Sequence, residues 1–158
     1  MEPIVSYRRA ATGVWGYRFF QGKREVCQIS TIVGPNSMVR IDAPGISWHS
    51  TFNIDNTIIP GISRRVNDND GKDVFRIIYC EPGFYRIVFE NRESLLVERR
   101  EGKYLYGVQG EPVLAQTERI EGQDVGDEYS PYFQTTIYED VQREKLLSML
   151  AFPILRFY

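Results

Sequence analysis

The sequence predicts a mainly-β fold, an antiparallel closed barrel of about twelve strands around a buried hydrophobic C-terminal helix. Short runs of β-branched and aromatic residues, separated by turn residues, fill most of the chain. Before roughly the last twenty positions, apolar residues do not recur at the spacing of a helix. The final apolar segment has apolar residues on every side and no polar face. With 158 residues, 42% hydrophobic and 25% charged, the chain has the size and composition of one globular domain, residues 1–158.

The predicted strands form hairpins and a meander. Residues 14–20 and 24–32 flank a Gln-Gly-Lys turn, and residues 61–67 and 73–79 flank the polar tip Asp68–Lys72. Residues 121–131, rich in Gly, Asp and Glu, are expected to form the one long solvated loop. The other strands are expected at 5–9, 37–42, 47–55, 84–89, 94–100, 103–108, 113–120 and 133–139.

Alternating side chains indicate which faces are buried. Tyr104, Tyr106 and Val108 are expected to share one buried face of their strand. Residues 75–79 and 84–89 are apolar on both faces except for one arginine each, so these central strands are expected to be covered on both sides.

The C-terminal segment predicts a helix at about residues 141–152, capped by Asp140. From Leu146 onward apolar residues occupy every side, and such a helix must be buried all round or lie in lipid. The apolar stretch is shorter than the roughly 20 residues that a membrane span needs, so the barrel is expected to enclose it. Pro153 is expected to bend or end the helix.

The strand Phe133–Tyr138, the polar turn 139–145 and the apolar run Leu146–Leu155 together resemble the C-terminal end of the tubby-like superfamily. That superfamily includes tubby proteins, phospholipid scramblases and LURP-one-related proteins, and its fold is a twelve-stranded barrel around a hydrophobic helix. The stretch from Arg64 to Ile87, with Asp70-Gly71 at a hairpin tip, is similar to LURP-one-related hairpins. The resemblance covers about a third of the chain and implies a binding or scaffold module.

Tubby proteins hold a phosphoinositide head group with a cluster of Lys and Arg. No such cluster matches this sequence position by position, so lipid binding is here an expectation that rests on the resemblance. The anion- or lipid-binding candidates in this sequence are Arg64 and Arg65, one of several pairs of adjacent basic residues, and Arg76 and Arg86. The last two have apolar neighbours and are expected to be half-buried beside a carboxylate.

Charge and cysteine content narrow the class of partner and compartment. The net charge of -2, with basic and acidic residues mixed along the chain, is not typical of a nucleic-acid-binding protein. Cys27 and Cys80 lie in strand-like runs without a recognisable signal peptide, so free, buried thiols in a cytoplasmic protein are expected. Expected partners are an anionic phospholipid or membrane surface, which would make the protein peripheral to a membrane, or another protein.

No catalytic or metal-binding pattern is evident. His49 is the single histidine and has no nucleophile-elbow serine around it, so a strand histidine with satisfied hydrogen bonds is expected. Asn67–Gly71 suggests a calcium loop, but aligning Gly71 with the sixth loop position puts Val66 first and Ile77 twelfth, and neither side chain carries oxygen. No enzyme activity, metal or cofactor is therefore predicted.

Three interpretations of function remain open from the sequence. The first is the tubby-like binding or scaffold module. The second is a lipocalin-like carrier of small hydrophobic ligands, which Gly13 and Trp15 near the N-terminus and the chain length favour, although its helix would need only one apolar stripe. The third is an enzyme with a dispersed site that uses His49.

Overall fold

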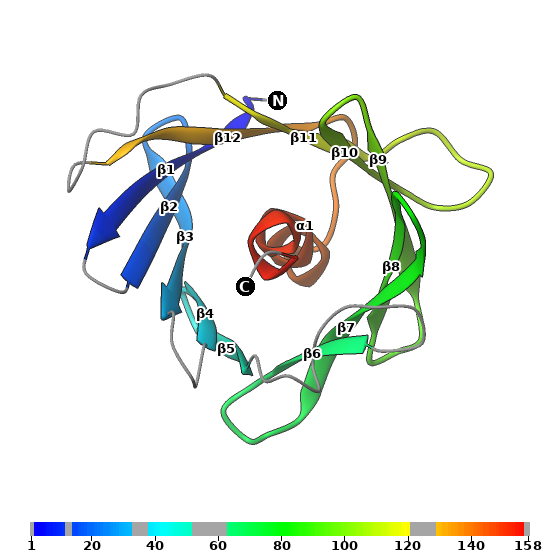
Figure 1. Cartoon of the computed structure of the whole chain (residues 1–158), viewed down its shortest axis with the longest axis horizontal. Coiled ribbons are helices and arrows are strands. Elements are labelled where there is room, and N and C mark those ends of the chain that lie inside the picture. Colours follow the sequence, from blue (N-terminus) through cyan, green and yellow to red (C-terminus); the bar gives the residue numbers. More distant parts are fainter. Residues whose placement is uncertain (1, 12–13, 33–37, 52–62, 121–128, 157–158) are drawn as a thin grey trace.

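The computed structural model describes residues 2–11, 14–32, 38–51, 63–120 and 129–156. Twelve strands and one helix occur in these ranges, and Figure 1 shows the strands as a ring around the helix. The strands are β1 Ile4–Ala11, β2 Val14–Gln21, β3 Arg24–Ile32, β4 Met38–Ala43, β5 Ile46–Thr51, β6 Ser63–Asn67, β7 Asp73–Glu81, β8 Phe84–Phe89, β9 Ser94–Arg100, β10 Lys103–Gly107, β11 Ala115–Arg119 and β12 Ser130–Ile137. The helix is α1 Arg143–Leu155.

Every strand pairs antiparallel with its neighbours in the chain, and β1 pairs with β12 to close the barrel. Closure satisfies the backbone groups that an open sheet would leave at its two edges. The predicted fold class, a twelve-stranded antiparallel closed barrel with a C-terminal helix, is therefore confirmed. The bounds of β8 and β9 agree with the sequence prediction, and the part of the predicted long loop at residues 121–128 lies outside the described residues.

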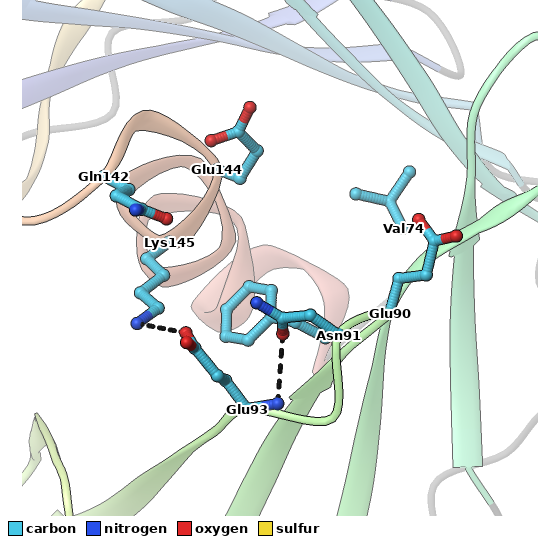
Figure 2. Close-up of a pocket in the computed structure, with 8 residues that line it drawn as sticks. Val74, Glu90, Asn91, Glu93, Gln142, Glu144 and Lys145 are labelled. Carbon is cyan, nitrogen blue, oxygen red and sulfur yellow. Dashed lines mark hydrogen bonds and ion pairs between the residues drawn. The ribbon is translucent and has the colours of Figure 1, made fainter.

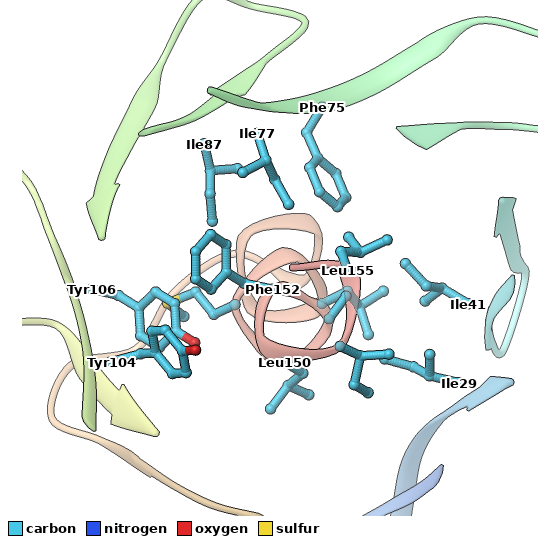
Figure 3. Packing of buried hydrophobic residues seen from close by; sticks show 14 of the residues in the cluster. Ile29, Ile41, Phe75, Ile77, Ile87, Tyr104, Tyr106, Leu150, Phe152 and Leu155 are labelled. Atoms are coloured by element: carbon cyan, nitrogen blue, oxygen red, sulfur yellow. The ribbon is translucent and has the colours of Figure 1, made fainter. Parts of the chain in front are cut away.

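Helix α1 fills the barrel. All nine residues from Leu147 to Leu155 are buried, as expected for a helix that is apolar on every side. Figure 3 shows the inward side chains of the strands around them. Phe152 packs edge-on against Tyr85, Tyr104 and Tyr106, with ring centroids 5.2, 5.3 and 6.1 Å apart.

The predicted ends of the helix are wrong. The helix begins at Arg143, later than expected, and its N-cap is Gln142 in an extended conformation without a side-chain cap, rather than Asp140. Pro153 lies inside the helix, which continues to Leu155. Proline near a C-terminus removes a single hydrogen bond, and burial of Ile154 and Leu155 against the barrel offsets that loss.

Three burial predictions also need correction. Cys27 is buried, but Cys80 is exposed near the end of β7, although both thiols are free as predicted. Val108 is 39% exposed because β10 ends at Gly107 and the chain turns outward there. The outer faces of β7 and β8 are not covered, since Phe84 is 43% exposed and Val74 is half-buried.

Candidate anion-binding rim

Arginine and aromatic side chains gather at the barrel end where α1 ends. Strands β1 and β11 finish at this end, and β2 and β12 begin there, because neighbouring strands are antiparallel. This topology brings Arg8 and Arg9 at the end of β1 close to Arg119 at the end of β11. We call Arg8, Arg9 and Arg119 the arginine rim.

Two guanidinium groups of the arginine rim lie against one ring. The Cζ atoms of Arg8 and Arg119 are 3.9 and 3.5 Å from the centroid of the Tyr132 ring. Arg8 also lies 4.3 Å from the ring centroid of Trp15, and only 9% of it is exposed. Arg119 is exposed and donates to the backbone oxygen of Tyr132 at 3.1 Å. Cation–π contacts of this kind fix where an arginine points and leave its positive charge in place.

The third guanidinium, that of Arg9, lies on the outer face of the barrel. Its Cζ is 4.8 Å from the ring centroid of Tyr129, which packs over Gly16. A Cβ at Gly16 would lie 3.3 Å from the Tyr129 hydroxyl, so the ring sits directly against the strand backbone. No described carboxylate forms an ion pair with Arg9 or Arg119, whereas nearby Arg18 pairs with Glu25.

Aliphatic side chains lie beside these arginines. Val14 begins β2 and Ile32 ends β3, and the two residues are directly paired across the strands. They are 38% and 46% exposed, so an apolar pair stands at the same barrel end as the arginine rim. Exposed aliphatic, aromatic and guanidinium groups together are typical of a surface that contacts a lipid interface.

Arg64 and Arg156 lie at the C-terminus of α1 at this end. The Arg64 guanidinium is 1% exposed and donates to the Leu155 carbonyl and, at 3.0 Å, to the Ser50 hydroxyl. Arg156 donates to the Tyr85 and Tyr104 hydroxyls at 2.8 and 2.6 Å. A cation stabilises the negative end of a helix, and the last turn of α1 has no basic residue of its own. Burial lowers the pKa of Arg64 to about 10, so it remains charged at neutral pH.

The four arginines predicted from the sequence do not form one site. Arg64 points into the barrel, whereas Arg65 and Arg76 point outward as cross-strand neighbours, with Asp73 3.9 and 4.0 Å away. The expectation that Arg76 and Arg86 are half-buried is wrong, because both face outward and are exposed. Arg76 has the expected carboxylate neighbour, but Arg86 forms no ion pair with a described carboxylate. Their predicted anion binding stays a prediction.

His49 lies on the outer face of β5, across from Arg40 on β4 and Asn67 on β6. Its imidazole makes no hydrogen bond or ion pair within the described part of the chain, so the expected hydrogen bonds are not found. No group of three or more potential metal ligands occurs among the described residues. Asp68 accepts from the backbone N–H groups of Asp70 and Lys72 at 2.9 and 3.0 Å, which makes residues 68–72 the predicted hairpin tip.

The opposite barrel end has a hollow of about 220 Å³ beside the start of α1 (Figure 2). Two of the three glutamates that line it, Glu90 and Glu93, are paired with lysines. Lys145 lies 2.7 Å from Glu93 and lowers the pKa of its carboxyl, and Lys72 lies 2.7 Å from Glu90. Because most of its charges are already paired, this hollow is a weaker candidate for binding a charged ligand than the arginine rim.

By architecture the protein is a closed, helix-filled barrel with a cationic, aromatic rim at one end. Comparison with protein-family models, with curated proteins and with solved structures finds no match to this chain. No helix in the described ranges is long and apolar enough to cross a membrane.

Proposed function

We propose that the protein is a non-enzymatic binding module of the tubby-like kind that docks its arginine rim on anionic phospholipid head groups. One observation carries the proposal. Arg9 and Arg119, which have no carboxylate partner among the described residues, lie at the same barrel end as the exposed aliphatic pair Val14 and Ile32. Guanidinium groups bind phosphate through paired N–H donors, and aliphatic side chains gain from entering the head-group region.

The aromatic contacts support a phosphate ligand. Rings hold the guanidinium groups without neutralising them, as a carboxylate would. Each arginine near an anionic membrane contributes about 1 kcal/mol of attraction, and this attraction falls with ionic strength. A net charge of -2 is compatible with this local attraction, because the three arginines of the rim lie close together.

The filled interior favours a binding module over a lipocalin-like carrier. A carrier needs an internal cavity, whereas here Met149, Leu150 and Phe152 of α1 are buried against the barrel wall. An enzyme that uses His49 is also disfavoured, because no described acid, serine or cysteine forms a hydrogen bond or ion pair with this imidazole. The proposal therefore places the function on the outside of the barrel.

The test is co-sedimentation of the purified protein with vesicles of phosphatidylcholine, with and without phosphatidylserine or phosphoinositide, at low and physiological salt. We expect binding only with the anionic lipids, weakened by salt. The double variant Arg9→Ala/Arg119→Ala is expected to bind roughly 30-fold more weakly, because about 2 kcal/mol of attraction is lost.

A matched control removes two cations from the other barrel end. Lys23 and Arg24 are exposed at the β2–β3 turn, and Lys23→Ala/Arg24→Ala is expected to bind as the unmodified protein does. Val14→Ser/Ile32→Ser separates a membrane surface from a free soluble anion, since only the former loses affinity in this variant. Equal binding by the rim and control variants, or no binding to any anionic vesicle, would overturn the proposal.

A further inference from the structure

A groove of about 420 Å³ lies on the barrel wall, away from the interior. Strands β8, β9 and β10 lie side by side there (Figure 1), and the outward Leu96 and Leu105 form the floor. One wall is β8, and the other is the β10–β11 loop, residues 108–114. The arginine rim contributes no residue to this groove, so it provides an independent surface.

The groove is apolar and open to solvent. Phe84, Val108 and Val113 line it and are 43%, 39% and 40% exposed. The sequence predicts cover on the outer face of β8, and no described segment of the chain supplies it. Exposed apolar side chains grouped in this way mark an interaction surface rather than ordinary solvent-facing residues.

The wall formed by the loop is fixed in place. Leu114 N–H donates to the Tyr106 carbonyl at 2.8 Å, and Glu111 N–H donates to the Val108 carbonyl at 3.0 Å. The loop also packs close to the strand, because a Cβ built on Gly107 would be in van der Waals contact with Val113 Cα at 3.7 Å. The groove is therefore preformed, which lowers the entropic cost of binding.

Opposite charges stand on the two walls. Arg86 projects from β8 and Glu111 from the loop, and neither side chain forms an ion pair or hydrogen bond within the described ranges. Glu98 between them is neutralised by Arg100 at 2.7 Å. Glu81 adds a carboxylate on the β7 side. Because two uncompensated carboxylates share the groove with one arginine, a small anionic ligand is disfavoured.

From these charges we infer that the groove binds the same groove of a second copy of this chain, in a two-fold symmetric dimer. A two-fold interface must be complementary to itself. A two-fold axis that runs along the groove, in the plane of the interface, would bring Arg86 on one wall of each copy toward Glu111 on the opposite wall of the other. The wall residues Phe84, Val108 and Val113 would then be removed from water. Desolvated apolar groups supply the affinity, and the two symmetric ion pairs set the register.

Charge reversal tests this pairing. Sedimentation velocity on the full chain over a micromolar concentration series is expected to show a reversible monomer–dimer equilibrium. Arg86→Glu alone and Glu111→Arg alone each create two like-charge contacts per dimer, and each is expected to weaken dimerisation at least about tenfold. The double variant Arg86→Glu/Glu111→Arg restores both pairs and is expected to dimerise within about threefold of the unmodified chain.

Lys23→Glu makes the same charge change on β2–β3, away from the groove, and is expected to leave the equilibrium unchanged. A monomer at every concentration would overturn the inference. Single variants that dimerise normally would also overturn it. Single variants that are disrupted without rescue in the double variant would overturn the symmetric pairing of Arg86 with Glu111.

Discussion

Arg64 and Arg65 are neighbours on β6 with opposite environments, because successive strand side chains point to opposite faces. Arg64 is 1% exposed at the C-terminus of α1, whereas the Arg65 side chain is 60% exposed. The sequence does not show which of the pair is inside. The hydrogen bonds of Arg64 to Leu155 and Ser50 show that this buried charge is held by the fold itself.

Arg64→Ala is expected to lower the free energy of unfolding by about 3–5 kcal/mol, because it removes a buried cation and leaves the Leu155 carbonyl without that donor. Arg65→Ala is the matched control and is expected to change stability by less than about 0.5 kcal/mol. Urea denaturation followed by tryptophan fluorescence measures both. Equal effects of the two substitutions would contradict the assigned role of Arg64.

Cys27 gives a pH-dependent prediction. Burial raises the pKa of its thiol from 9.0 to about 12. Above pH 9 the thiol ionises in the unfolded chain but stays protonated in the folded one, which favours unfolding. The stabilisation that Cys27 contributes is therefore complete below pH 9 and is lost as the pH rises toward 12. The stability advantage of the unmodified chain over Cys27→Ala is expected to shrink by about 1.4 kcal/mol per pH unit in this window. Denaturation curves at several pH values measure this difference, and a difference in unfolding free energy that does not change with pH would contradict the prediction.

Among the elements, α1 is one whose burial could be predicted from the sequence but whose ends could not. Its all-round apolar surface is enough to predict burial inside a barrel, since no amphipathic stripe is available for packing on an outer face. Its ends are not predictable in the same way. The start at Arg143 depends on how the chain enters the barrel, and continuation past Pro153 depends on packing that local propensity does not describe.

Leu150 tests the central position of α1. It is 1% exposed, so Leu150→Glu is expected to cost at least about 4 kcal/mol and to abolish cooperative unfolding in a barrel of ordinary stability. Gln142→Glu introduces the same residue at the exposed start of the helix, where a negative charge is favourable, and is expected to be neutral or slightly stabilising. Cooperative unfolding of Leu150→Glu near the unmodified midpoint would argue against a helix-filled barrel.

At the scale of the whole molecule, barrel closure creates the candidate site. Arg8 lies far in sequence from Arg119 and Tyr132, which are on the consecutive strands β11 and β12, and it meets them only because β1 pairs with β12. The turns in the sequence predict which consecutive strands pair. Which side chains meet where β1 pairs with β12 depends on the register of that pairing, which the turns do not set. The bulge between Ser6 and Tyr7 in the β1–β12 pairing is one such feature without a sequence signal.

Docking through the arginine rim is tested most directly by quenching of Trp15 fluorescence with anionic vesicles that carry a spin label just below the head groups. Trp15 contacts the arginine rim, whereas the only other tryptophan, Trp48, is 5% exposed and packs against Phe75 inside the barrel. We expect quenching on vesicle binding, and we expect it to be lost in Trp15→Phe although that variant still binds. Binding without quenching, or quenching that persists in Trp15→Phe, would contradict docking through the arginine rim.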